Sequence, residues 1–248
     1  MIDDSSRFSR IMSNQLITID GPTGSGKSTV SRLLAQRLHY HYLDTGAMYR
    51  AVGLAILRAG VSLHNKKEIT RICNSLEIKF IHEGDATKIY LDNEDVTKAI
   101  REPAIDLIAS DISALDTVRK VMTILQRKIG SQGPLVAEGR DMGTVVFPEA
   151  QHKFYIDASL EVRVDRRFQE RQKRGESISR EKVKKDLIKR DNQDMNRHLS
   201  PLIPARDANI IDTTNLSPHQ IVGKIMKDMV TQVQSSTVHG SRLRSDEN

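Results

Sequence analysis

Short apolar runs alternate with amphipathic segments along most of the chain. Five of these runs have the length and apolar content of buried strands. The predicted strands are LITID (16–20), YHYLD (40–44), GPLVAE (133–138), HKFYID (152–157) and ANIID (208–212). Strands that alternate with helices are typical of parallel sheets. The pattern therefore predicts an α/β fold: a doubly wound, five-stranded parallel sheet in a three-layer α/β/α arrangement.

One region departs from this alternation. Residues 76–81 (LEIKFI) and 88–92 (KIYLD) alternate apolar and polar side chains on either side of a turn-forming segment, as the strands of a hairpin do. The region 62–97 is thus predicted to be a small inserted antiparallel β subdomain. Two helices should follow at 103–114 and 117–130, and the apolar stripe of the second is typical of a helix that packs on the core.

The segment 162–190 is dense in arginine and lysine and contains few large apolar residues. Such a segment is typical of a solvated helical surface and is equally compatible with a mobile lid. Both ends of the chain are polar and irregular, which indicates flexible tails. The expected organisation is a flexible N-terminal tail (1–14), a core (15–61 and 98–231) that includes a short helical lid at about 162–190, the inserted subdomain (62–97) and a flexible C-terminal tail (232–248).

The composition fits a globular protein with anionic ligands. The chain has 248 residues, 38% of them hydrophobic, and a net charge of +6. Only 4% of the residues are aromatic and tryptophan is absent, so stacking platforms for single-stranded nucleic acid are scarce. Cys73, the only cysteine, is expected to pack as a small apolar residue. With no signal peptide and no apolar run of about 18 residues, the protein is expected to be cytoplasmic, without a membrane partner.

The segment GPTGSGKST has the frame G-x-x-x-x-G-K-[ST] between a predicted strand and an amphipathic helix. Its glycines allow consecutive N–H groups to surround an anion at the positive end of the helix dipole, so the loop should hold the phosphates of ATP or GTP. Lys27 would reach the β and γ oxygens, and the Ser28 hydroxyl would bind Mg²⁺. The candidate residues for binding the cofactor ATP are Gly21, Pro22, Thr23, Gly24, Ser25, Gly26, Lys27, Ser28 and Thr29.

A second segment, LDTGAMYRA (43–51), places an acid at a strand end and polar side chains at the start of a helix. Arg50 is suited to grip a phosphate with both arms of its guanidinium group, and Thr45 and Tyr49 are suited to position that phosphate as neutral donors. On the residues alone, a surface salt bridge explains Arg50 equally well.

A third segment, VAEGRDMGTVVFP, brings charges to the carboxyl end of a strand, where open α/β sheets bind ligands. Glu138 is placed to orient magnesium-bound water, Arg140 to contact phosphate, and Asp141 to accept hydrogen bonds from an amino group. The alternative is a tight turn with a local ion pair.

In a fourth segment, RDNQDMNR, Arg190, Asp194 and Arg197 share one face of a predicted helix. Two guanidinium groups that flank a carboxylate are suited to a nucleotide, although an ordinary surface ion pair has the same spacing. A run of arginines in the preceding helix is typical of a solvated face and would supply positive charge if it lay near a triphosphate. That run is Arg163, Arg166, Arg167, Arg171 and Arg174.

The four segments DGPTGSGKST, LDTGAMYRA, EGRDMGTVVFP and RDNQDMNR, in this order and spacing, closely resemble bacterial cytidylate kinases over about residues 16–231. This family consists of P-loop nucleoside monophosphate kinases of pyrimidine metabolism. The resemblance implies Mg-dependent transfer of the γ-phosphoryl group of ATP to CMP or dCMP, giving CDP or dCDP. It also implies a core, a CMP-binding domain with an insert, a short lid and a monomeric state.

The resemblance assigns roles to polar residues within and between these segments. Arg50, Arg140 and Arg197 would bind the acceptor phosphate, Arg190 and Asp194 the sugar, and Ser110, Arg119 and Asp141 the edge of cytosine. Ser113 is an alternative to Ser110. The implied substrate-binding residues are Thr45, Tyr49, Arg50, Ser110, Arg119, Arg140, Asp141, Arg190, Asp194 and Arg197, and the implied catalytic residues are Lys27, Arg140 and Arg190.

Two other functions are compatible with parts of the sequence. A kinase for another acceptor, such as UMP or an alcohol, would keep the phosphate loop, but an alcohol would also need a base to take its proton. A nucleic-acid-binding NTPase would fit the charge and the loop only, and the chain contains no recognised nucleic-acid motif. We therefore expect small-molecule partners and no nucleic acid.

Overall fold

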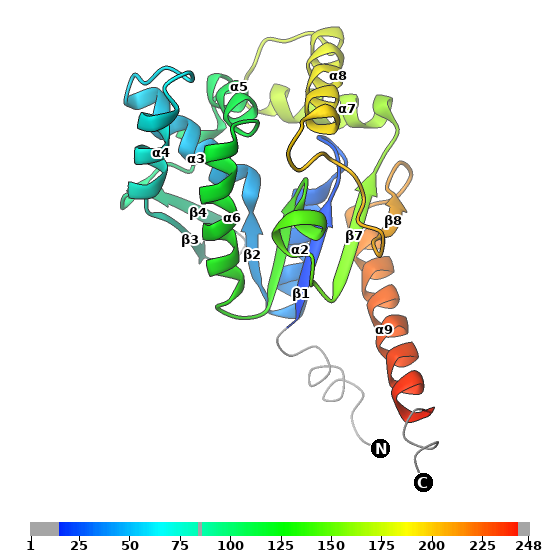
Figure 1. Ribbon diagram of the computed structural model, residues 1–248. Helices are drawn as coiled ribbons and strands as arrows, with labels where there is room; N and C mark the ends of the chain where they lie inside the picture. The colour runs from blue at the N-terminus through cyan, green and yellow to red at the C-terminus, as the bar shows by residue number, and fades with distance from the viewer. Residues whose placement is uncertain (1–14, 84–85, 243–248) are drawn as a thin grey trace.

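The main sheet is seen in a computed structural model that describes residues 15–83 and 86–242 (Figure 1). Its five strands are all parallel and lie in the order β2, β6, β1, β7, β8. Their bounds are β1 Leu16–Asp20, β2 His41–Asp44, β6 Leu135–Gly139, β7 His152–Asp157 and β8 Asn209–Asp212. The five predicted strands and their parallel arrangement are confirmed.

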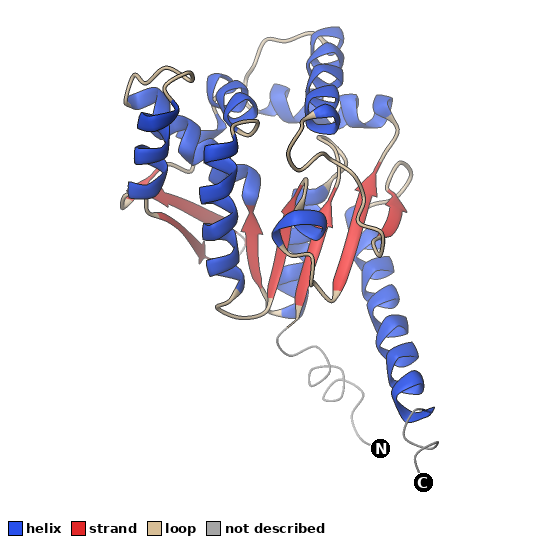
Figure 2. Ribbon diagram, viewed as in Figure 1, coloured by secondary structure: helices blue, strands red, loops and turns tan. Residues whose placement is uncertain are grey.

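Helices cover both faces of this sheet, which confirms the three-layer prediction (Figure 2). Helices α2 (Lys27–Leu38) and α9 (Pro218–Arg242) pack on one side, and α3 (Thr45–Arg58) and α6 (Asp116–Gly130) on the other. Side chains alternate along a strand, so in β1 Ile17 and Ile19 pack towards α2 and α9, whereas Thr18 and Asp20 point to the opposite face. The central strand thus carries a buried polar side.

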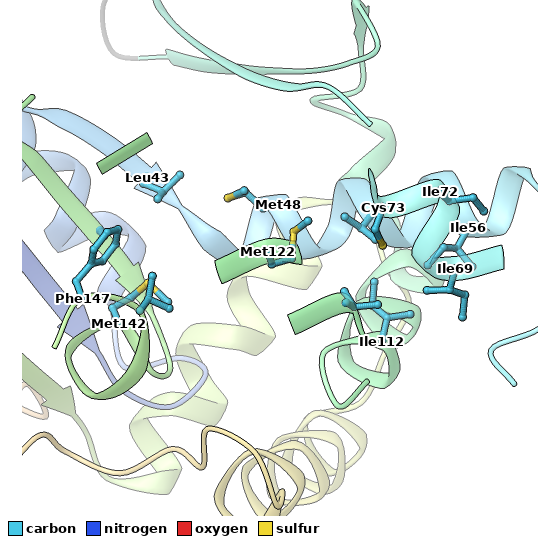
Figure 3. Close-up of a cluster of buried hydrophobic side chains, with 14 of the residues drawn as sticks. Leu43, Met48, Ile56, Ile69, Ile72, Cys73, Ile112, Met122, Met142 and Phe147 are labelled. Carbon is cyan, nitrogen blue, oxygen red and sulfur yellow. The ribbon is translucent and has the colours of Figure 1, made fainter. Parts of the chain in front are cut away.

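The larger apolar core lies between the sheet and the helices α3, α4 (Lys66–Ser75) and α6 (Figure 3). Leu43, Met48 and Met122 are completely buried in it, and each such side chain contributes about 1.5–3 kcal/mol of transfer free energy. Cys73 belongs to the same core and is 1% exposed. Burial raises the pKa of its thiol to about 11, so the prediction that Cys73 serves as a packing residue is confirmed.

The inserted region forms a second, antiparallel sheet in the order β3, β4, β5. Its strands are β3 Ile78–Glu83, β4 Ala86–Leu91 and β5 Glu94–Asp95, and the predicted hairpin is confirmed. The sequence pattern does not indicate β5, which has two residues and follows a tight turn with positive φ at Asp92 and Asn93. It also does not indicate α4, which is capped by the Asn65 side chain and buries Ile69.

The two helices predicted after the insert are present as α5 (Pro103–Ile112) and α6. A 3-10 turn, η1 (Ala99–Arg101), leads into α5. A π-helical turn, η2 (Met142–Val146), directly follows the residues Gly139 to Asp141 at the end of β6.

The arginine-rich segment forms a helical hairpin of α7 (Leu160–Lys173) and α8 (Arg180–Asn196), above the carboxyl ends of the strands (Figure 1). The two helices share a small core of Val164, Val183 and Leu187, separate from the cores on the sheet. Helix α9 continues to Arg242 and therefore overlaps the expected C-terminal tail, whereas residues 243–248 and the expected tail 1–14 lie outside the described residues. In the described part of the chain, no helix has both the length and the apolarity that a membrane span requires.

Candidate active site

A cavity of about 540 Å³ lies at the carboxyl ends of β1, β2 and β6. Positive side chains outnumber carboxylates in its wall, so the cavity favours an anionic ligand. The cations are Lys27, Arg32, Arg50, Arg101, Arg119, Arg140, Arg167, Arg174, Arg190 and Arg197, and the carboxylates are Asp44, Asp106, Glu138, Asp141, Glu170 and Asp194.

The loop between β1 and α2 has a backbone that requires glycine. Gly24 and Gly26 have φ values of 81° and 95°, in the left-handed region. A Cβ atom on Gly21 would lie 2.0 Å from the carbonyl oxygen of Ile156 in β7, so a larger residue has no room there. Helix α2 begins at Lys27, and its N-terminus therefore meets the N–H groups of the loop. The loop thus has the glycine backbone and the helix N-terminus on which the prediction depends, and phosphate binding by it stays a prediction.

Lys27 is buried in the wall of this cavity, with 6% of its surface exposed. Its Nζ donates a hydrogen bond to the carbonyl oxygen of Pro22 at 2.6 Å. Burial, followed by the nearby Arg140, lowers the pKa of Lys27 to about 7. A phosphate placed here would relieve both effects, because an anion favours the charged form of the amine.

Two arginines of α7 bind the outer side of the phosphate loop. Arg163 Nη1 donates to the carbonyl oxygen of Thr23 at 3.3 Å, and Arg166 Nη1 donates to that of Ser25 at 3.2 Å. A trans peptide directs its N–H opposite to its carbonyl group, so the N–H groups of Gly24 and Gly26 face away from these arginines. Arg163 and Arg166 therefore hold the loop instead of lining the cavity.

The other three arginines of this run have different surroundings. Arg167 and Arg174 line the cavity. Arg171 is engaged within the α7–α8 hairpin, where it pairs with Glu176 at 2.6 Å and with Asp186 at 3.3 Å. Of the five arginines that the sequence offers as charge near a triphosphate, Arg167 and Arg174 are placed to provide it.

Glu138, at the end of β6, accepts hydrogen bonds from one residue of α2 and one residue of β2. Ser28 Oγ donates to Oε2 at 3.0 Å, and the Tyr42 hydroxyl donates to Oε1 at 2.5 Å. Burial, and then the nearby Asp44, raise the pKa of Glu138 to about 7. Tyr42 is absent from the residues that the sequence indicates, because nothing in the β2 segment shows that β6 is its neighbour in the sheet.

This raised pKa leads to a prediction about stability and pH. Because folding raises the pKa of Glu138 from 4.5 to about 7, the folded state binds the proton more tightly, and stability falls as pH rises through this interval. The side chain of Glu138→Gln does not ionise, so the variant should not lose stability in this way as pH rises. In thermal unfolding without nucleotide or divalent metal, we expect the variant to exceed the wild type in Tm by at least about 2 °C at pH 8, and by less at pH 5.

Glu149→Gln is the control for Glu138→Gln, because Glu149 is an exposed glutamate outside the cavity. Its Tm should follow that of the wild type at both pH values. A Glu138→Gln variant that is no more stable than the wild type at pH 8 would contradict the prediction.

The residues after β6 meet those of α8 across the cavity. Arg140 Nε donates to Asp194 Oδ2 at 2.8 Å, and its Nη2 donates to Thr23 Oγ1 at 2.7 Å. Asp141 accepts a hydrogen bond from Arg119 and has Arg197 at 3.7 Å. Two segments that are more than 50 positions apart in the sequence thus form one network of charges.

The segment at the start of α3 lies in the same cavity. Thr45 Oγ1 donates to the carbonyl oxygen of Glu138 at 2.6 Å, and Arg50 pairs with Asp44 at 3.3 Å. The ring of Tyr49 lies 5.8 Å from the guanidinium carbon of Arg119, within the range of a cation–π contact. All three side chains that the sequence indicates here line the cavity.

The two candidate serines of α5 and its end are placed differently. Ser110 Oγ donates to Gln193 Oε1 of α8 at 3.1 Å, and Ser110 is not part of the cavity wall. Ser113 lines the cavity, and its carbonyl oxygen accepts a hydrogen bond from Arg119 at 3.0 Å.

Several arginines of the cavity retain unused donors. In the described part of the chain, Arg190 Nε is buried without a hydrogen-bond partner, as are Arg50 Nε, Arg119 Nε and Arg197 Nη2. Burial, and then Arg140, lower the pKa of Arg190 to about 10. Buried donors without partners are costly, and an anionic ligand that accepts from them would remove this cost.

The structure adds residues to the cavity that the sequence motifs do not include. Thr87 comes from β4 of the inserted sheet, Thr97 from the turn after β5, and Arg101 from η1. Asp106 of α5 also lines the cavity and pairs with Arg167 of α7 at 2.5 Å. None of these lies in a recognisable motif, so only the fold could identify them.

Comparisons of the sequence with known proteins identify its family. Residues 17–231 match the sequence model of the family described as "Cytidylate kinase". A relative of that name from Carboxydothermus hydrogenoformans is 46% identical over 211 residues, which are 85% of this chain and 95% of the relative. Another of that name, from Citrifermentans bemidjiense, is 43% identical over 217 residues, covering 88% and 93%.

A solved structure of an uncharacterized protein from Eubacterium ventriosum has a similar fold. Its TM-score is 0.50 at 12% identity, with 87% of this chain and 98% of that chain covered. This likeness concerns the fold alone, whereas the match of residues 17–231 and the identities above 40% extend over most of the sequence. The chain belongs to the cytidylate kinase family and is a nucleoside monophosphate kinase.

Proposed function

We propose that the enzyme transfers the γ-phosphoryl group of ATP to CMP or dCMP in the presence of Mg²⁺, giving ADP and CDP or dCDP. The observation that carries this proposal is the buried pair of Arg119 and Asp141, which lies in the same cavity as Lys27. A carboxylate beside a guanidinium group is suited to a polar base edge, and Lys27 with the loop after β1 is suited to phosphates.

On the acceptor side, Arg50, Arg140 and Arg197 are proposed to bind the phosphate, and Arg190 and Asp194 the sugar. Their support is that all five line one cavity, three of them with unused donors. Arginine is suited to this role because its planar fork matches the oxygens of a phosphate.

At the base, Arg119 and Asp141 are proposed to read the edge of cytosine, which offers an N4 amino donor beside the N3 acceptor. Uracil has an O4 acceptor and an N3 donor at these places and would leave both side chains mispaired. Ser113 is favoured over Ser110 as a third contact, because Ser113 lies in the cavity wall next to Arg119.

The reaction needs no general base, because the attacking phosphate oxygen of the acceptor is already anionic at neutral pH. Catalysis is then positioning and charge neutralisation. Lys27 is proposed to bind the β and γ oxygens of ATP, while Arg140 and Arg190 stabilise the negative charge between donor and acceptor. The unused Nε of Arg190 supports this role.

The residues present also fit Mg²⁺. Ser28 Oγ and the Glu138 carboxylate are oxygen donors within 3.0 Å of each other, at the N-terminus of α2. Oxygen donors of this kind are what Mg²⁺ prefers. Ser28 is proposed to bind the ion directly and Glu138 to hold one of its waters, and the ion itself would neutralise phosphate charge.

This assignment predicts that Ser28→Ala needs at least about ten times more Mg²⁺ for half-maximal activity, because one ligand is lost. The measurement is ADP production at saturating ATP and CMP over a range of Mg²⁺ concentrations. Ser31→Ala is the control, since the Ser31 hydroxyl lies on the same helix, buried and without a hydrogen-bond partner in the described residues. An unchanged Mg²⁺ requirement in Ser28→Ala would contradict the assignment of Ser28 as a magnesium ligand.

The hairpin of α7 and α8 is proposed to act as the lid, and the inserted sheet as part of the CMP-binding domain. Supporting this, both contribute side chains to the cavity, and Arg167 of α7 already pairs with Asp106 of α5. Closure would exclude water around the phosphates. A monomeric state and a cytoplasmic location stay predictions.

The experiment that tests the function is ADP production from ATP and Mg²⁺ with CMP, dCMP, UMP, AMP and shikimate offered separately, and with no acceptor as the blank. We expect turnover largely confined to CMP and dCMP. Turnover without an acceptor, or only with shikimate, would agree with ATP binding by the phosphate loop. It would contradict the assignment of the acceptor site to CMP.

A further inference from the structure

The central strand β1 ends in a buried carboxylate that has no part in the mechanism above. Asp20 is 4% exposed, and its two oxygens accept hydrogen bonds from the backbone N–H groups of Met142 at 2.9 Å and Gly143 at 2.8 Å. These residues directly follow Arg140 and Asp141 in the chain. A carboxylate that binds two successive N–H groups restrains both the position and the direction of that turn.

We infer that Asp20 is a positioning residue for the acceptor: by holding the N–H groups of Met142 and Gly143, it keeps Arg140 and Asp141 directed into the cavity. This inference rests on the proposed function, because it takes these two side chains to bind CMP. Asp20 is not part of the cavity wall, so it acts through the turn and not on the substrate.

Two further contacts show that the turn is tightly held. A Cβ atom on Gly143 would lie 3.0 Å from Thr18 Oγ1, so the turn packs closely against β1. At the far end, Arg127 of α6 donates to the carbonyl oxygens of Val145 and Val146, both at 2.9 Å. An anion thus binds the N–H end of the turn and a cation binds its carbonyl end, in agreement with the direction of the peptide dipoles.

The position of Asp20 also links the two halves of the site. The next residue, Gly21, begins the loop that holds the donor phosphates, whereas the carboxylate of Asp20 holds the turn of the acceptor side. Burial raises its pKa to about 6, and the two N–H bonds act in the opposite direction, so Asp20 is ionised at neutral pH. In this form each of its two oxygens accepts from one of the N–H groups, whereas a side-chain amide would place an NH2 donor against one of them.

The test is Asp20→Asn, which keeps the shape and loses one of the two acceptors. We expect KM for CMP to rise by about tenfold while KM for ATP changes by less than about twofold. In direct competition, the preference for CMP over UMP should fall by at least about fivefold, because Asp141 is displaced. Competition reports only on folded, active enzyme, so a partly unfolded preparation does not obscure the ratio.

Thr18→Val is the matched control. Thr18 is buried two residues before Asp20 on the same face of β1, and its hydroxyl has no hydrogen-bond partner in the described residues. We expect both KM values and the CMP preference to stay within about twofold of the wild type. An effect as large as that of Asp20→Asn would show that any change at this face of β1 suffices, and would overturn the inference.

An unchanged KM for CMP in Asp20→Asn, or equal increases in both KM values, would also overturn it, because Asp20 would then support the fold alone. Gly143→Ala is a second route if Asp20→Asn does not fold, because its Cβ would lie 3.0 Å from Thr18 Oγ1, so that the turn or the Thr18 side chain must shift. The same selective loss for CMP is expected there, and its absence would count against the inference. Failure of the proposed function is distinct, because it appears in the wild type as missing turnover of CMP.

Discussion

Lys27→Ala is expected to lower kcat by at least about a thousandfold while the protein stays folded. The side chain lies in the cavity wall beside the phosphate loop, and no other lysine lines that wall in the described residues. The free energy of unfolding of Lys27→Ala should not be lower than that of the wild type. Because folding lowers the pKa of Lys27 from 10.5 to about 7, its charged form is disfavoured in the folded state at neutral pH, and its removal ends this penalty. ADP production and thermal unfolding at pH 7 measure the two effects.

Lys153→Ala is the matched comparison for this variant. Lys153 is also buried and also donates to a proline carbonyl, that of Pro148 at 2.6 Å, but it lies outside the cavity. It pairs with Asp207 as well, so its loss should reduce Tm while kcat stays within about threefold of the wild type. Equal losses of activity in the two variants would attribute the effect to the buried amine and not to a phosphate contact.

Asp141→Asn is expected to lower the preference for CMP over UMP, measured as the ratio of the two kcat/KM values, by about a hundredfold. The asparagine keeps the size of the side chain but replaces one acceptor oxygen by an amino donor, which suits O4 of uracil. It also removes the negative charge that pairs with the buried Arg119. Steady-state kinetics with CMP and UMP as separate acceptors provide the ratio.

Asp191→Asn is the control for this change of charge. Asp191 forms a similarly buried pair with Arg163, at 2.6 Å, outside the cavity. Breaking either pair should cost stability, by about 3–5 kcal/mol for a fully buried one, but only the change at Asp141 should alter the base preference. If Asp141→Asn keeps the ratio of the wild type, the assignment of Asp141 to the cytosine edge is wrong.

The elements that could be predicted are those whose pattern is local. The five core strands are covered by helices, which makes each a short, nearly continuous apolar run that is visible in the sequence. Helix α4 is harder to predict from the sequence, because its apolar face consists of few residues within a charged segment. Ile69 and Cys73 are among them. Strand β5 has two residues and exists through its pairing with Tyr90 and Leu91, which no local pattern encodes.

In the candidate site, too, local patterns could be predicted from the sequence and contacts between distant segments could not. Each of the four motifs contributes residues to the cavity wall, because the motifs lie at strand ends and helix starts. The rotation of α5 decides that Ser113, directly after the helix, reaches the cavity wall and Ser110 does not, and no local sequence pattern specifies this rotation. The direction of the arginines of α7 is likewise a result of packing, which turns Arg163 and Arg166 to the loop and leaves Arg167 and Arg174 in the cavity.

The sequence by itself determined the phosphate loop, the α/β fold class and the family resemblance, because glycine spacing and apolar periodicity act over a few neighbouring residues. The tertiary structure alone decided which distant residues meet. Tyr42 reaches Glu138 across 96 positions, and Asp20 reaches Met142 across 122. Both contacts depend on the strand order β2, β6, β1, which results from packing the whole sheet between its helices and not from any one segment.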